Sequence, residues 1–146
     1  METKVEMCDL GEIKHKGKTL AIIARKNLKV DGVNFFTPED YPLQLGVSLY
    51  KKGGKIRPHL HVPIRRVIGI TQEMLHIDKG KVRIIFYSDK KEEVASSILT
   101  SGDTVILSGG HGIEVLEDTK IIEVKQGPYM GVEKEKLFWG KDDSSK

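Results

Sequence analysis

Short apolar runs alternate with turn residues along most of the chain, and few of them repeat at helical spacing. Runs of about four to eight residues bounded by Gly, Pro, Asn or Asp are typical of β-strands. We predict strands at residues 19–25, 33–36, 43–50, 55–62, 73–77, 81–87, 94–99, 104–107, 111–116 and 120–126. Residues 1–18 are polar and poorly patterned, and a helical turn or two fits only residues 38–41 or 132–137. Many short strands at a spacing of about ten residues predict an all-β sandwich or barrel.

The predicted strand at residues 55–62 carries two histidines, His59 and His61, with Leu60 between them. Side chains alternate between the two faces of a strand, so both imidazoles point the same way. Imidazole is the commonest protein ligand for metals, and two of them on one strand can hold a single cation. Glu73 begins a later predicted strand, and His111 follows a Gly-rich loop. We expect these side chains to converge inside the β-fold.

Three imidazoles and one carboxylate suit Fe, Mn, Ni, Cu or Zn. On an octahedral ion they leave two positions open, whereas on tetrahedral zinc they close the coordination shell. Other interpretations stay open: the His59 and His61 pair can act without metal or line a cavity. Glu73 can be a surface carboxylate beside a turn, and His111 can be an exposed loop residue. His76 has the opposite strand parity to Glu73, so it faces outward if Glu73 faces inward.

Composition and charge exclude several classes of protein. The 146 residues fit one domain, and a hydrophobic content of 38% with 31% charged residues is ordinary for a globular protein. The net charge is only +3 and no basic cluster is interleaved with aromatic residues, so we expect no nucleic-acid partner. The single cysteine, Cys8, excludes a disulfide within the chain and fits a reducing compartment. Without a signal-like N-terminus or a membrane-length apolar run, we expect a cytoplasmic protein with no membrane partner.

The spacing of the site residues resembles the first sequence motif of the cupin family. That motif reads Gly, five residues, His-x-His, and then Glu, six residues, Gly. Here five residues separate Gly53 from the histidine pair, and six separate Glu73 from Gly80. The spacer between the two halves, residues 62–72, is longer than in the family pattern.

The second cupin motif begins with Gly, five residues, Pro-x-Gly and then His. Here Gly102 is followed by DTVIL, and Ser108 takes the place of the proline shortly before His111. The resemblance covers residues 43–126. It implies a single cupin-type β-barrel (jelly roll) within residues 1–140, with short N- and C-terminal extensions, and we expect a disordered tail at residues 141–146.

The resemblance also implies a ligand set for one divalent transition metal, which is Fe, Mn, Ni, Cu or Zn. The implied ligands are His59, His61, Glu73 and His111. The runs NFFTPEDYPLQLG and EVKQGPY are similar to small bacterial cupins without assigned chemistry, some of them associated with surface-polysaccharide genes. The four-ligand set that the resemblance implies indicates a metalloenzyme, an oxygenase or an isomerase, that acts on a small polar substrate, and the gene association suggests a sugar.

Two other functions remain open. A metal-free isomerase or epimerase of nucleotide-sugars needs a histidine base and a tyrosine acid, for which Tyr87 and Tyr129 are candidates. Arg65 lies near the histidine pair in sequence and can anchor an anionic substrate. A non-catalytic module that binds a small ligand is the third interpretation. Strand edges that need cover predict a homodimer, and Phe138 and Trp139 are expected to cover an edge or a subunit contact.

Overall fold

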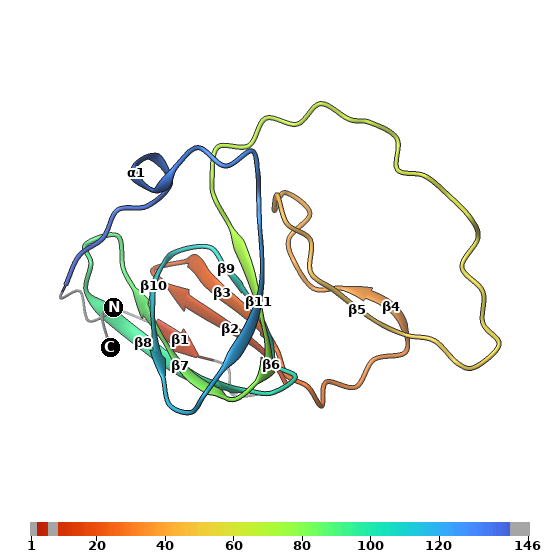
Figure 1. The fold of residues 1–146 in the computed structure, drawn as a ribbon, viewed down its shortest axis with the longest axis horizontal. Coiled ribbons are helices and arrows are strands. Elements are labelled where there is room, and N and C mark those ends of the chain that lie inside the picture. Colours follow the sequence, from red (N-terminus) through yellow and green to blue (C-terminus); the bar gives the residue numbers. More distant parts are fainter. Residues whose placement is uncertain (1–2, 6–8, 141–146) are drawn as a thin grey trace.

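The structure is a computed structural model that describes residues 3–5 and 9–140. These residues form antiparallel strands joined by turns and loops (Figure 1). The strands are β1 Thr3–Val5, β2 Leu10–His15, β3 Lys18–Ala24, β4 Gly32–Phe35, β5 Gly46–Leu49, β6 Glu73–Lys79, β7 Lys81–Tyr87, β8 Glu93–Thr100, β9 Thr104–Leu107, β10 Gly110–Val115 and β11 Lys120–Lys125. A short helix, α1 Val132–Glu135, follows β11, within the range where the sequence predicts a helical turn. The predicted all-β class is confirmed.

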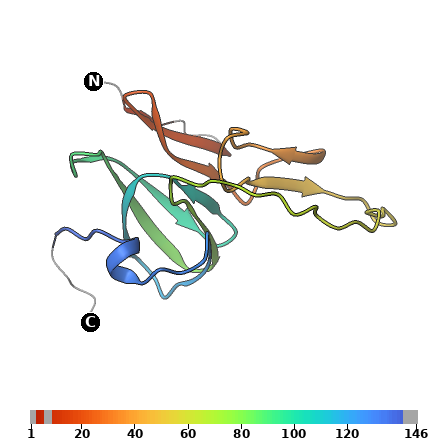
Figure 2. The ribbon, with the colours of Figure 1, turned by 90° about the horizontal axis from the view of Figure 1, so that it is seen from above.

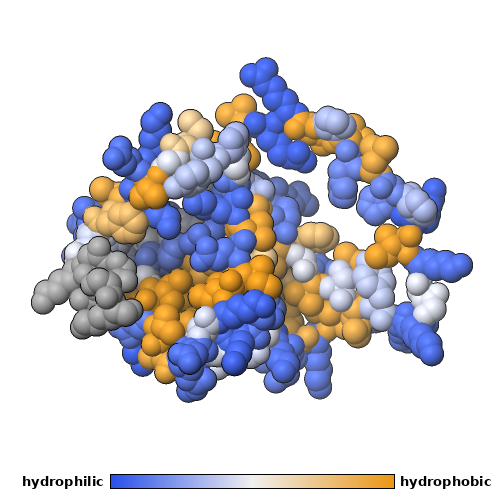
Figure 3. Space-filling view, viewed as in Figure 1, coloured by the Kyte–Doolittle hydropathy of each residue, from blue (hydrophilic) through white to orange (hydrophobic). Residues whose placement is uncertain are grey.

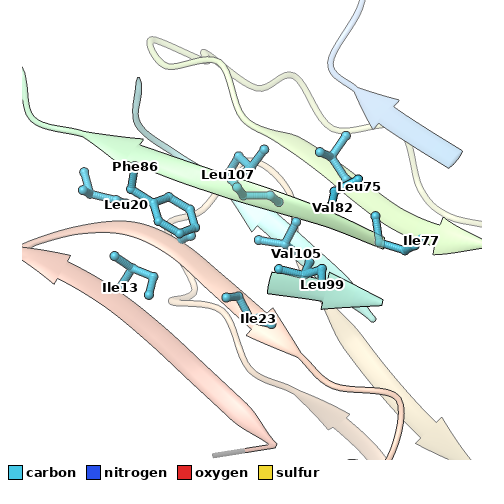
Figure 4. Packing of buried hydrophobic residues seen from close by; sticks show 12 residues of the cluster. Ile13, Leu20, Ile23, Leu75, Ile77, Val82, Phe86, Leu99, Val105 and Leu107 are labelled. Atoms are coloured by element: carbon cyan, nitrogen blue, oxygen red, sulfur yellow. The ribbon is translucent and has the colours of Figure 1, made fainter. Parts of the chain in front are cut away.

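The described strands form three antiparallel sheets. The largest has the order β1-β2-β3-β9-β6-β11, the second has the order β10-β7-β8, and β4 pairs with β5 as a separate hairpin. The two larger sheets face each other across the core (Figure 4). Within the described residues these sheets do not close into one barrel, so the jelly roll stays a prediction.

Strand alternation places the core between the two larger sheets. In β7, every second residue is fully buried: Val82, Ile84 and Phe86. Leu75 and Ile77 of β6 are also fully buried and belong to the same cluster, so the inner faces of the two sheets pack against each other (Figure 4). The first residues of β6 and β10 lie at one end of this core. Polar side chains that point inward at these positions therefore border the core.

A second, smaller cluster covers the outer face of the largest sheet. Ile106 of β9 and Ala24 of β3 lie on this face, and Leu45 packs on them together with partly buried Leu43 and Tyr41. The segment that leads into β5 is therefore held against the sheet. Beyond it, the β4–β5 hairpin extends away from the two larger sheets (Figures 1 and 2).

Residues 50–71, here called the arm, contain no strand. The arm continues outward from the hairpin and returns to β6 (Figures 1 and 2). The predicted strand at residues 55–62 is therefore wrong for this structure. A strand needs a hydrogen-bonded neighbour, and within the described part of the chain no backbone hydrogen bond joins residues 55–71 to another segment.

The N-terminal region also differs from the prediction, because β1 and β2 lie within residues expected to be irregular. Ile13 of β2 is buried in the core, and pairing with β3 forms the strand despite its polar composition. No helix in residues 3–5 and 9–140 is long and apolar enough to cross a membrane. Cys8 and the expected tail at residues 141–146 lie outside the described residues.

Candidate functional site

Glu73 and His111 meet at one end of the core, one from each of the two larger sheets. Glu73 is the first residue of β6 and shares the inner face of that strand with Leu75 and Ile77. His111 lies opposite buried Phe86 in the β10–β7 pairing, so it also points inward. Its Nε2 atom lies 2.7 Å from Glu73 Oε1, and the two side chains are only 27% and 18% exposed.

The backbone at Gly109 passes close to the core, and its carbonyl orients the His111 ring. The carbonyl of Gly109 accepts a hydrogen bond from His111 Nδ1 at 2.9 Å, which leaves Nε2 to face Glu73. A side chain at residue 109 does not fit, because its Cβ would lie 2.7 Å from Leu20 Cδ2 in the core. The glycine therefore allows the loop to come close enough for its carbonyl to hold the ring.

The pair carries opposite charges that stabilise each other. The hydrogen bond from His111 lowers the pKa of Glu73 below its ordinary value of 4.5, and the nearby charges of His111, Lys136 and Lys125 lower it further against the opposing effect of burial. Burial acts to lower the pKa of His111, but the hydrogen bonds to Glu73 and to the Gly109 carbonyl outweigh it and raise the pKa above 6.5. In the metal-free site each side chain therefore favours the charged form of the other.

Gln72 fixes the start of β6 and with it the position of Glu73. Its side chain is buried, with its Nε2 donating to Ser108 Oγ at 2.9 Å and its Oε1 accepting from the Leu43 backbone N–H at 3.3 Å. Its own backbone N–H donates to Gln126 Oε1 at 2.8 Å. Sequence analysis did not find this role, because a glutamine next to a predicted strand has no distinctive spacing.

A cavity of about 320 Å³ opens beside the pair. Besides Glu73 and His111, its lining includes Lys125, Lys136 and Trp139. Phe138, Leu137 and Glu135 also line it, so the C-terminal segment forms one wall. Two lysines and two carboxylates line it, but Glu73 is already paired with His111 and Glu135 accepts a hydrogen bond from the Met130 backbone N–H, so the lysines can attract an anionic molecule with an apolar face.

Trp139 is a wall residue that the sequence analysis assigned elsewhere. Its ring packs edge-on against Tyr87, with the centroids 5.3 Å apart, and it lies so close over Gly110 that a Cβ there would be 3.1 Å from the indole. In the sequence, the only sign of this role was that Phe138 and Trp139 are apolar residues in a polar segment. That pattern does not show which part of the fold they contact.

The two histidines of the arm lie apart from this pocket. The His59 and His61 rings are 5.2 Å apart in an edge-on arrangement, and both residues are exposed. His59 Nδ1 lies 2.8 Å from the Arg57 carbonyl. In the part of the chain that the structure describes, no three His, Cys, Asp or Glu residues gather closely enough to hold a metal ion. The structure thus brings the four expected ligands together as two separate pairs, Glu73 with His111 and His59 with His61.

The remaining candidates lie outside the pocket. Tyr87 pairs with Gly110, one position from the His111–Phe86 pair, so its side chain is on the opposite face of the sheet from His111. Tyr129 is 64% exposed and lies under the Lys125 ammonium, 5.6 Å from ring to nitrogen. Arg65 is exposed on the arm. The expected parity of His76 is confirmed: it turns away from the core and bonds Thr104 Oγ1 at 2.8 Å.

The geometry of the Glu73–His111 pair fits half of a metal site. Two neighbouring ligands on an octahedral ion, each bonded at about 2.1 Å, lie about 3.0 Å apart, which is 0.3 Å more than the 2.7 Å between Nε2 and Oε1. Metal-binding histidines usually donate their other N–H to a carbonyl or carboxylate, as His111 does to Gly109. Two protein ligands alone make a weak site, and the other two expected ligands are on the arm.

Comparison of the chain with protein-family models, with curated proteins and with solved structures finds no match. Evidence for function therefore comes from the geometry and charge of the site itself.

Proposed function

We propose that this chain is a metal-binding enzyme of the cupin type that acts on a small anionic molecule, such as a sugar that carries a phosphate or carboxylate. The observation that carries the proposal is the Glu73–His111 pair, with the histidine oriented by the Gly109 carbonyl beside a cavity of about 320 Å³. Burying two charged side chains costs desolvation free energy. Such groups are often found at functional sites. We also propose that the protein is cytoplasmic and has no nucleic-acid partner.

His111 Nε2 and Glu73 Oε1 would hold the metal, and His59 and His61 of the arm would supply the remaining imidazoles. The bound ion supplies Lewis-acid chemistry that polarises an oxygen of the substrate. Its element is one of Fe, Mn, Ni, Cu or Zn, all of which accept nitrogen and carboxylate ligands.

The other side chains of the pocket select and orient the substrate. Lys125 and Lys136 attract an anionic group, and their charges already act on Glu73. Phe138 and Trp139 present an apolar wall to the face of a sugar ring and keep water from that side. Together these residues favour a ligand with one anionic end and one flat, weakly polar face.

Metal content provides the test. The purified chain, incubated with each of the five candidate metals and then desalted, is expected to retain close to one ion per chain of at least one element. His111→Ala and Glu73→Gln each remove a ligand and should reduce retention at least about tenfold. His76→Ala is the matched control, because His76 lies on the same strand but on the opposite face. A parent chain that retains none of the five metals would contradict the proposal.

A second candidate is a metal-free isomerase or epimerase of nucleotide-sugars. It is favoured by the Glu73–His111 pair itself, because an imidazole oriented by a carboxylate can transfer protons without an ion. In its neutral form His111 would take a proton from the carbon next to a carbonyl. This function also needs an acid on the other face of the substrate, and Tyr87 and Tyr129 do not line the pocket. Conversion of nucleotide-sugars that persists in excess chelator and is lost in His111→Ala would favour this function over the first.

A further inference from the structure

The arm has the residue pattern of a strand and lacks a partner strand. Ile56, Leu60, Val62 and Ile64 occupy alternate positions, with Arg57, His59 and His61 between them. The apolar members are exposed to between 61% and 78%, and Figure 3 shows apolar residues along the outer part of the arm. A segment with a strand pattern and unpaired backbone groups is typical of one that completes a sheet elsewhere, whichever of its two faces is apolar.

The second sheet has an edge strand, β10, to which a further strand can be added. β10 is the terminal strand of that sheet, so within the described residues one side of its backbone has no neighbour. Ile113 and Val115 follow His111 on the same face of β10 and are 37% and 64% exposed. A strand added along this edge would lie about 4.8 Å from β10, which places an inward-facing His-x-His pair beside His111 and its neighbour Glu73.

Charge favours this pairing. The arm carries six basic residues and no acidic one. The segment that includes β10, β11 and α1, residues 110–135, carries six acidic and three basic residues. A basic arm is attracted to this acidic segment as a whole, although Glu114, the acidic residue of β10 itself, already pairs with Arg83.

The arm does not lie on its own pocket. Its base is anchored at one end by the pairing of β5 with β4 and at the other by the hydrogen bonds of Gln72 to Ser108 and Leu43. From this base the arm extends away from the two larger sheets (Figures 1 and 2). In each chain the His59–His61 pair lies on the arm, away from the sheets, and the Glu73–His111 pair lies in the pocket. The arm of a second copy can therefore supply the histidine pair that this pocket lacks.

We propose that two copies exchange arms, so that the arm of one chain adds along the free edge of β10 in the other and supplies His59 and His61 to that chain's Glu73–His111 pocket. This inference rests on the proposed metal-binding function. The exchange is reciprocal, because each chain contributes an arm and accepts one, and it creates two sites per dimer, each built from both chains.

Complementation between two inactive variants tests the exchange, with Co²⁺ as the probe. His59→Ala/His61→Ala lacks the arm pair and Glu73→Gln/His111→Ala lacks the core pair, so each alone should retain at least about tenfold less Co²⁺ than the parent. After the two variants are unfolded and refolded as an equal mixture, half of the dimers are mixed, and each mixed dimer has one intact site. The expected content is about 0.25 Co²⁺ per chain in the mixture.

The possible results separate the two proposals. A parent that binds close to one Co²⁺ per chain, with a mixture that binds none, overturns the exchange and leaves the metal-binding function standing, because the four ligands then come from one chain. A parent that binds neither Co²⁺ nor any of the five candidate metals overturns both.

Light scattering gives a second measurement that does not depend on metal or on refolding. The parent is expected at twice the 16.4 kDa mass of one chain. Leu60→Pro/His61→Pro removes two adjacent backbone donors, one of which must face β10 in the added strand, and should give monomers. The control Ile98→Asp alters a 42% exposed residue of β8 and should remain dimeric. A parent that is monomeric while it holds metal would overturn the exchange.

Discussion

At the scale of single residues, the site depends on how His111 is held between two acceptors. The Gly109 carbonyl lies 2.9 Å from Nδ1 and the Glu73 carboxylate lies 2.7 Å from Nε2, so each ring nitrogen has an acceptor within hydrogen-bond distance. Each partner favours the charged form of the ring, which offsets the cost of its burial. The same arrangement leaves Nε2 directed at Glu73 when the ring is neutral.

This pair predicts a pH-dependent contribution to stability in the metal-free protein. The folded pKa of Glu73 is lowered, so its contribution is present above 4.5 and is lost as the pH falls through the folded value. The folded pKa of His111 is raised, so its contribution is complete below 6.5 and is lost as the pH rises through the folded value. Both contributions are therefore present together between about pH 4.5 and 6.5.

Urea unfolding in the presence of chelator measures this effect. The difference in unfolding free energy between the parent and His111→Gln should be about 2 kcal/mol near pH 5.5 and smaller above pH 8. His76→Gln should show no such pH-dependent difference. A difference for His111→Gln that stays constant from pH 5 to 9 would contradict the charged pair.

Gly109 predicts a second effect at the residue scale. In Gly109→Ala, the new Cβ would lie 2.7 Å from Leu20 Cδ2, so either the core or the loop must shift. We expect a loss of about 1 to 3 kcal/mol of unfolding free energy, together with weaker metal retention because the carbonyl that holds His111 moves.

Gly69→Ala is the control for this substitution. No atom lies within 4 Å of a Cβ built at Gly69, so its unfolding free energy should change by less than about 0.5 kcal/mol. Equal effects of the two substitutions would show that the contact between residue 109 and Leu20 is unimportant.

At the scale of secondary structure elements, β6 connects the core, the site and the arm. Its inner face carries Leu75 and Ile77, its first residue is Glu73, and the residue before it, Gln72, ties the end of the arm to the core. The strand therefore keeps the carboxylate in place even though the arm that precedes it extends away from the sheets.

A double-mutant cycle of Gln72 and Ser108 tests this anchor. The Gln72 Nε2–Ser108 Oγ hydrogen bond is 2.9 Å long and joins the start of β6 to the loop before His111. Gln72→Ala and Ser108→Ala should each destabilise the fold, and the double variant should lose less than the sum, with a coupling of about 1 kcal/mol. Strictly additive losses would mean that the bond does not contribute to stability.

At the scale of the whole molecule, charge is distributed unevenly. The net charge is only +3, yet the arm alone holds six of the 24 basic residues and no acidic residue. In an arm-exchanged dimer this basic segment lies beside the acidic segment at residues 110–135, whereas in a separate chain it extends into solvent.

The uneven charge predicts a dimer that weakens with salt. Sedimentation equilibrium should show a dissociation constant that rises about threefold or more between about 0.05 and 0.5 M NaCl, because salt screens the attraction between the two segments. Apolar contacts do not weaken with added NaCl, so a dissociation constant that is unchanged or falls would show that charge does not hold the arm.

Much of the fold follows from local pattern. The alternation in residues 81–87 and the turns at Gly80 and Gly102 predicted strands that the structure contains as β7, β8 and β9. The pattern failed at residues 55–62, where alternation shows that a strand is possible but not which edge it pairs with. It also failed in β2, whose sparse apolar residues form a strand because β3 provides a neighbour.

The sequence by itself determined the all-β class and the face on which each strand residue lies, because alternation is a property of the backbone of a single strand. It thereby placed Glu73 and His76 on opposite faces of their strand, but it did not decide which face is inward. Only the tertiary structure decided that Glu73 meets His111, that Gln72 and Trp139 belong to the site, and that His59 and His61 lie elsewhere. These contacts join residues distant in sequence, and they depend on how sheets pack and which edges remain unpaired, which no local pattern specifies.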